Sequence, residues 1–200
     1  MGRREGGVGR GGRQGVRDRE GLHARLAPVL QDVANGQRPW KVFLDALSDA
    51  LGGAAVVLVI GDDRTDRGPE VETAGIDEPF RVAFIEQFAL RDPWIDGLAR
   101  GPVGAVGFGY ETLPRPLLTA SRFYTEWMRP QGLAVTRTIH AVVGAGPDRT
   151  GCVLTVFQRA DGPTLEIEDV ALIRSLMPDL RQSVEAHRAR VSTGGSTPTT

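Results

Sequence analysis

The 200-residue chain has one cysteine, Cys152, and one lysine, Lys41. A single cysteine excludes an internal disulfide and is typical of a reducing compartment, so we expect a cytoplasmic protein. Cys152 opens an apolar stretch, where a thiol is usually a small buried filler. No apolar run approaches the roughly 20 residues that span a bilayer, and the N-terminus lacks the apolar core of a secretory signal. We therefore expect no membrane association.

Residues that carry catalysis or hold metals are few and scattered. The three histidines, His23, His140 and His187, are far apart, and no pair has the spacing of metal ligands. His140 lies in a predicted strand and is interpreted as a structural residue with satisfied hydrogen bonds. The chain has no G-x-S-x-G nucleophile elbow. The glycines of residues 104–109 lack the lysine of a phosphate loop and indicate close backbone approach instead. We expect no enzyme, no catalytic residue, no metal site and no cofactor.

The net charge of −1 is unevenly distributed along the chain. Residues 1–20 contain six Arg and three acidic residues and carry +3, so residues 21–200 carry −4. Affinity for duplex nucleic acid comes largely from basic side chains that displace counterions, so we expect no direct DNA binding by this chain. Residues 1–20 are rich in Gly and Arg and are predicted to be disordered. Residues 191–200 are predicted to be a flexible tail.

Hydrophobic periodicity predicts alternating helices and strands between these tails. Two of the strand connections look like hairpins, which favours an antiparallel sheet. The predicted fold class is therefore α+β, a central antiparallel sheet with helices packed on its faces. Helices are predicted at 22–33, 39–51, 77–91, 122–129 and 166–190, and strands at 54–60, 70–73, 105–112, 134–143 and 152–159. The helix at 122–129 is expected to end before Pro130.

The last predicted helix, residues 166–190, has a wide apolar surface. Its width exceeds what packing on a sheet usually requires, so part of it is expected to face a partner. We therefore predict a homodimer that uses this helix, with a kink at Pro178. The apolar positions are Val170, Leu172, Ile173, Leu176, Met177, Leu180 and Val184.

The stretch R-F-Y-T-E-W-M-R-P-Q-G-L at Arg122–Leu133 gathers three aromatic residues on one short predicted helix. Phe123 and Trp127 are one turn apart and share a face, while Tyr124 flanks them. Small-molecule pockets are mostly aromatic and apolar with a few polar groups. The alternative is a plain core with amphipathic rims. The predicted ligand-binding residues are Asp92, Trp94, Tyr110, Phe123, Tyr124 and Trp127.

Several short motifs occur in the order of a known family. They are P-W-K-V-F-L-D-A-L at Pro39–Leu47, the apolar strand after Gly53, R-D-P-W at Arg91–Trp94, the aromatic stretch itself, and L-M-P-D-L-R at Leu176–Arg181. Over about 145 residues the chain resembles the N-terminal sensor region of LuxR-type transcriptional regulators, a GAF/PAS-like domain related to autoinducer-binding domains. The resemblance implies an α/β/α sandwich over residues 21–190.

The resemblance also carries expectations about the ligand. In lactone receptors of this family an Asp-Pro such as Asp92-Pro93 supplies a carboxylate to the ligand amide. The Tyr and Trp that those receptors place upstream are absent from residues 75–79. The family continues into a helix-turn-helix module, and the sequence ends at Thr200 without one, which is expected of a truncated regulator or a stand-alone sensor.

The function predicted from the resemblance is a non-enzymatic, small-molecule-sensing, dimerising domain of a LuxR-type regulator. The alternative is a ligand-free interaction module that forms heterodimers with a full-length regulator. An open pocket bounded by Trp94, Tyr110 and Trp127 would favour the sensor. A pocket filled by its own side chains would favour the interaction module.

Overall fold

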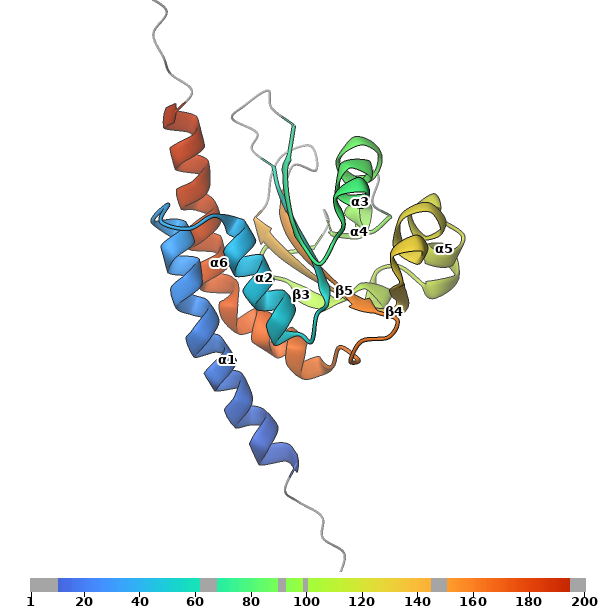
Figure 1. Cartoon of the computed structure of the whole chain (residues 1–200), viewed down its shortest axis with the longest axis horizontal. Coiled ribbons are helices and arrows are strands. Elements are labelled where there is room, and N and C mark those ends of the chain that lie inside the picture. Colours follow the sequence, from blue (N-terminus) through green and yellow to red (C-terminus); the bar gives the residue numbers. More distant parts are fainter. Residues whose placement is uncertain (1–10, 62–67, 90–92, 99–100, 145–150, 195–200) are drawn as a thin grey trace, which may run out of the picture.

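The computed structural model describes residues 11–61, 68–89, 93–98, 101–144 and 151–194. Within these residues a five-stranded antiparallel sheet separates a layer of long helices from a layer of short ones (Figure 1). The prediction of an α+β fold with helices on both faces of the sheet is confirmed. None of the described helices is long and apolar enough to cross a membrane.

The sheet has the order β2-β1-β5-β4-β3, in which every neighbouring pair is antiparallel. The last strand of the chain therefore lies at the centre of the sheet. Strand β3 is shorter than predicted, because a 3₁₀ turn at Gly109–Glu111 follows it directly. The strands are β1 (Ala55–Ile60), β2 (Glu70–Ala74), β3 (Val106–Phe108), β4 (Leu133–Gly144) and β5 (Cys152–Arg159).

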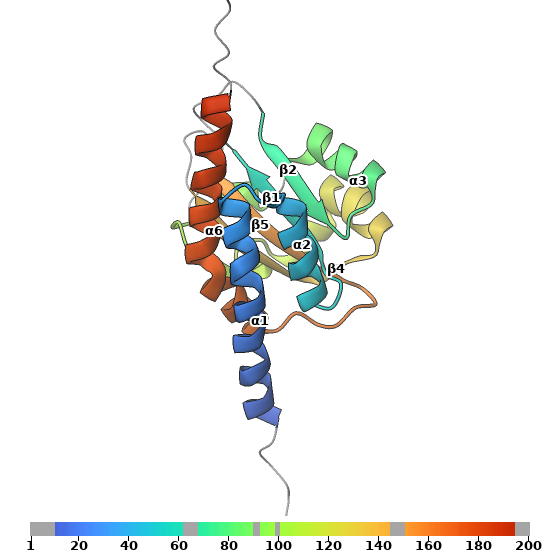
Figure 2. The ribbon, with the colours of Figure 1, turned by 60° about the vertical axis from the view of Figure 1, so that its left-hand side comes forward.

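The long helices are α1 (Gly11–Ala34), α2 (Trp40–Ala50) and α6 (Ile167–Gly194). Figure 2 shows α1 and α6 side by side over the sheet. Their contact is fixed by polar bonds as well as by packing: Ser183 Oγ donates to the carbonyl of Leu30 at 2.8 Å, and Arg190 donates to the carbonyls of Val33 and Ala34 at the end of α1. A guanidinium at the C-terminus of a helix satisfies carbonyls that the helix itself leaves unpaired.

The expectation that α6 presents part of its apolar stripe to a partner is corrected. Leu180 is 0% exposed and Val184 is 1% exposed within the single chain. Leu26, Leu30 and Val33 of α1 belong to the same core cluster and cover the stripe together with the sheet. The stripe is wide because it packs both on α1 and on the sheet of its own chain. Helix α6 also continues through Pro178.

Helices α1 and α6 both reach into the residues predicted as tails. Helix α1 begins at Gly11, inside residues 1–20, and α6 ends at Gly194, inside residues 191–200. Extending an existing helix adds one hydrogen bond per residue without the cost of nucleation. The strong periodic segments of α1 and α6 therefore continue into neighbouring residues that have no apolar pattern of their own.

The layer of short helices covers the other face of the sheet. The helix predicted at 122–129 is a π-helical turn, and the expectation that Pro130 ends it is corrected, because Pro130 lies in the first turn of the 3₁₀ segment that follows. Gly132 ends that segment in the left-handed region at φ 69°. The segments of this layer are α3 (Glu78–Ala83), η1 (Phe84–Phe88), α4 (Ile95–Leu98), η2 (Gly109–Glu111), α5 (Arg115–Thr119), η3 (Phe123–Met128) and η4 (Arg129–Gln131). Single π turns often occur at functional sites, and here both η1 and η3 are π turns.

Candidate ligand-binding site

An aromatic cluster lies between the two π turns and the sheet. We define it as Phe84, Phe88, Trp94, Phe123, Trp127 and Phe157, all of which are buried. The rings of Phe123 and Trp127 are 4.9 Å apart between centroids, and those of Trp127 and Phe157 are 5.4 Å apart. Trp94 completes the set, 5.9 Å from Phe123 and 6.4 Å from Phe157. The space between Trp94 and Trp127 is therefore filled by other side chains of the cluster.

Both indoles in the cluster are held by hydrogen bonds. Trp127 Nε1 donates to the carbonyl of Phe80 at 2.8 Å, and Trp94 Nε1 donates to the carbonyl of Gly109 at 2.9 Å. A buried indole that satisfies its only donor is typical of a core residue. The two indoles of the aromatic cluster are thus core residues.

The structure brings together four of the six predicted ligand-binding residues. Trp94, Phe123 and Trp127 belong to the aromatic cluster, and the half-buried Tyr124 packs against it. Tyr110 is 49% exposed and stacks on Phe108 at 5.2 Å, away from the cluster. Asp92 lies outside the described residues. Tyr110 therefore does not line the cluster, and the rings of Phe123 and Phe157 pack between Trp94 and Trp127.

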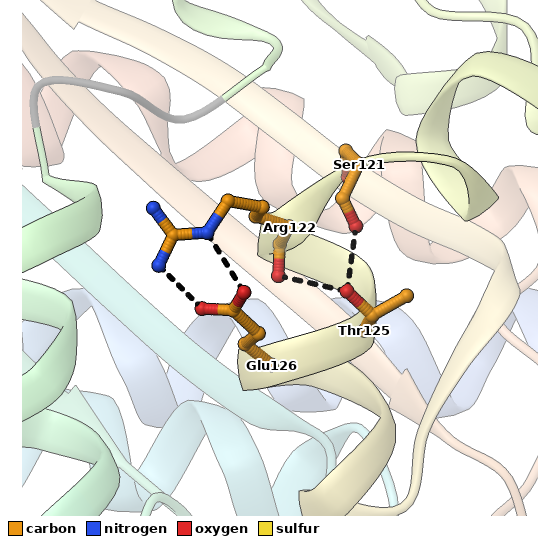
Figure 3. Close-up of polar contacts among 4 residues, drawn as sticks. All are labelled: Ser121, Arg122, Thr125 and Glu126. Carbon is orange, nitrogen blue, oxygen red and sulfur yellow. Dashed lines mark hydrogen bonds and ion pairs between the residues drawn. The ribbon is translucent and has the colours of Figure 1, made fainter.

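The polar residues of the aromatic stretch serve the π turn itself (Figure 3). Arg122 donates to both carboxylate oxygens of Glu126 at 2.7 Å, on the exposed side of η3. These hydrogen bonds lower the pKa of the Glu126 carboxyl and raise that of Arg122. Thr125 Oγ1 donates to the carbonyl of Ser121 at 3.1 Å, and Ser121 Oγ accepts from the backbone N–H of Tyr124. These contacts stabilise the turn.

A cavity of about 150 Å³ lies beside the aromatic cluster, at the β3 edge of the sheet. We call it the β3 cavity. An engineered apolar cavity of about 150 Å³ is large enough to bind benzene. Small residues make up much of its wall, and one acidic and one imidazole side chain contribute to it. Its lining consists of Gly97, Leu98, Gly101, Ala105, Val106, Gly107, Phe108, Glu111, Thr112, His140 and Val142.

The β3 cavity exists because β3 carries a glycine on the face that points towards it. Gly107 is the partner of His140 in the β3–β4 pairing. A Cβ on Gly107 would lie 2.6 Å from Glu111 Oε2, so the Glu111 carboxylate lies over the position of the missing side chain. A Cβ on Gly109 would lie 2.8 Å from His140 Nε2. Here the interpretation of the glycine-rich residues 104–109 as a site of close backbone approach is confirmed.

His140 is the most buried ionisable group of the cavity wall, with 3% of its surface exposed. Its Nδ1 is 3.0 Å from Thr155 Oγ1, whereas Nε2 has no hydrogen-bond partner among the described residues. Burial lowers the pKa of His140 to about 3, so the imidazole is neutral at physiological pH. His140 was expected to have its hydrogen bonds satisfied. This expectation is corrected for Nε2, which has no partner among the described residues.

Sequence reasoning did not identify His140 and Glu111 as members of a site. One signal in the sequence could have pointed to them: two glycines at alternate positions, Gly107 and Gly109, remove the side chains from one face of a short strand. A gap of that kind leaves room for a ligand or for a neighbouring side chain. The partner strand could not be assigned from the sequence.

The remaining candidates have structural explanations. Cys152 is fully buried, which raises the pKa of its thiol to about 12 and confirms its prediction as a buried filler. Within the described ranges no group of three or more His, Cys, Asp or Glu could hold a metal ion. Comparison with models of known protein families gives no match, and neither does comparison with curated proteins.

Proposed function

We propose that the chain is a non-enzymatic sensor domain, of the kind found in LuxR-type regulators, and that it binds a small molecule in the β3 cavity. The observation that carries this proposal is the cavity itself. It has the volume of a small organic molecule, it is bordered by small residues, and a carboxylate and an imidazole contribute to its wall. At the position first expected for the ligand the aromatic rings pack on one another, which supports placing the ligand in this neighbouring cavity.

The architecture supports the same proposal at the level of the fold. A central antiparallel sheet with helices on both faces is the α/β/α arrangement that the resemblance to GAF/PAS-like sensor domains implies. We further propose a cytoplasmic homodimer. Its contact surface must differ from the buried stripe of α6. The N-terminal part of α1 extends past the rest of the described chain in Figures 1 and 2 and is the surface we propose for it.

A second candidate function is the ligand-free interaction module. The filled aromatic cluster favours it, because a domain that senses nothing needs no cavity at its aromatic face. This candidate assigns the β3 cavity no ligand at all.

The two candidates differ in how the β3 cavity responds to a compact probe. We expect benzene to perturb the indole N–H signal of Trp94 in an NMR spectrum, because the Trp94 ring lies 4.8 Å from that of His140 in the cavity wall. The chain has three tryptophans, and Trp94→Phe identifies the signal. Gly107→Val places a side chain in the cavity, where it meets only the movable end of Glu111, and should abolish the response.

Gly68→Val is the matched control, because a Cβ at Gly68 meets nothing within 4 Å. This variant should respond to benzene as the parent does. An unchanged Trp94 signal at saturating benzene in the parent protein would refute the sensor proposal and leave the interaction module.

A further inference from the structure

We propose that the β3 cavity selects small primary amines, with the ammonium group at the Glu111 carboxylate and a compact apolar body against Leu98 and Val142. This inference rests on the proposed function of the same cavity and adds the chemical class of its ligand. Its starting point is the carboxylate that replaces a side chain on the floor of the cavity.

Among the described residues, the charge of the cavity wall comes from Glu111. The described lining has two ionisable side chains, Glu111 and His140, and His140 is neutral because its pKa is about 3. Glu111 forms no ion pair within the described part of the chain. Thr112 Oγ1 already donates to the carbonyl of Gly109 at 3.1 Å. The described part of the wall therefore presents one negative charge, that of Glu111, without an ion-pair partner in the described chain.

Two arginines near β3 do not neutralise this charge. Arg174 donates to the carbonyl of Val106 at 2.9 Å, and Arg137 donates to the carbonyl of Leu165 and to Glu166. Arg174 reaches β3 from α6. Arg137 lies over the ring of Phe108, whose side chain belongs to the core cluster on the α6 side of the sheet. Both guanidinium groups are thus engaged by acceptors other than Glu111.

The apolar part of the wall determines the size and shape of the rest of the ligand. Leu98, Val142 and the glycine backbone surround a volume of about 150 Å³, which suits a short branched chain or a small ring. A carboxylate ligand would meet the charge of Glu111 and be repelled. A neutral alcohol of the same shape would fit but would gain no ionic contact. An amine, protonated at pH 7 as a lysine side chain is, satisfies both the shape and the charge.

Three probes of nearly one shape separate these possibilities: isobutylammonium, isobutanol and isobutyrate. Each is titrated at pH 7 into the full chain while the Trp94 indole signal is followed. We expect isobutylammonium to bind about fivefold more tightly than isobutanol, which corresponds to about 1 kcal/mol for a partly exposed ion pair. Isobutyrate should bind most weakly. The amine preference should shrink in about 1 M salt, where charges are screened within about 3 Å.

Glu111→Gln keeps the shape of the side chain and removes its charge. The variant should bind isobutanol as the parent does and bind the amine no better than the alcohol. Glu126→Gln, at an exposed carboxylate outside the cavity, is the control and should retain the amine preference.

The outcomes distinguish this inference from the proposed function. Equal or tighter binding of isobutanol in the parent, or an amine preference that survives Glu111→Gln, overturns the assignment of the ligand class and leaves a small-molecule site. A Trp94 signal that responds to none of the three probes, nor to benzene, overturns both.

Discussion

Two buried tryptophans allow the contribution of one hydrogen bond to be measured in matched environments. Trp127 is 0% exposed and Trp40 is 3% exposed, so Trp→Phe removes a similar volume at each position. Trp127 Nε1 donates to the carbonyl of Phe80, whereas Trp40 Nε1 is buried without a hydrogen-bond partner among the described residues. The difference between the two substitutions therefore isolates the effect of the indole N–H.

The expected magnitudes follow from that contrast. Trp127→Phe loses the cavity term plus a hydrogen bond of about 1 kcal/mol. Trp40→Phe loses a similar cavity term, but it also removes a buried donor whose unsatisfied burial costs at least about 1 kcal/mol. Trp127→Phe should thus lower the free energy of unfolding by about 2 kcal/mol more than Trp40→Phe does. Trp127→Ala would cost about 3–5 kcal/mol, a large fraction of the roughly 5–15 kcal/mol of a typical domain.

Urea denaturation followed by far-ultraviolet circular dichroism measures both variants without relying on the tryptophans as the signal. Equal m-values in the parent and the variants would show that the same cooperative unit unfolds in each. An equal loss of stability for Trp40→Phe and Trp127→Phe would refute the assignment of these hydrogen bonds.

Three further predictions concern charge and packing. Because the pKa of His140 is lowered to about 3, the imidazole takes up a proton below pH 6.5 in the unfolded chain but only near pH 3 in the folded chain. The free energy of unfolding should therefore fall by about 1.4 kcal/mol for each unit by which the pH is lowered between these values. The double variant His140→Leu, Thr155→Val should lose this pH dependence in denaturation experiments between pH 4 and 7, and it should be nearly as stable as the parent at pH 7. If the free energy of unfolding of the variant depends on pH as steeply as that of the parent, the buried state of His140 is contradicted. Leu180→Glu should unfold the single chain, because it buries an unpaired charge between α1 and α6, and circular dichroism that shows an intact fold would contradict the packing of α6. The chain should show no sequence-specific duplex binding in gel-shift assays at physiological salt, and weak binding should vanish when residues 1–20 are deleted; specific binding that survives the deletion contradicts the charge argument.

Periodicity in the sequence was sufficient to predict the long elements. The apolar run before Gly61 is β1, the segment from Cys152 to Arg159 is β5, and the stripe of residues 166–190 is α6. Each of these segments repeats its pattern over several residues, so the predicted type does not depend on any single position. The short turns η1 and η3 could not be predicted as π turns, because the pattern of a single turn does not distinguish them from an α-helix.

The site could not be predicted, because it depends on which segments meet. The stripe of α6 was interpreted as a partner surface, since nothing in its own sequence shows that α1 covers it. Tyr110 and Trp127 were placed together because both are aromatic, yet they lie on different parts of the fold. The β3 cavity arises from the absence of side chains at Gly107 and Gly109, and such a gap becomes visible only when β4 supplies its other wall.

The central position of β5 has a consequence for how this protein is made. Strands β1 and β2 can pair early as a hairpin, but the other edge of β1 has no partner until β5 has left the ribosome. Until then the run Ala55–Ile60, all apolar, offers a free strand edge to any neighbouring chain. Strand β5 joins β1 to β4 in one step, and α6 can cover the sheet only afterwards. Nascent chains stalled before Cys152 should therefore depend on chaperones, and premature stop codons upstream of β5 should yield aggregates instead of a smaller domain.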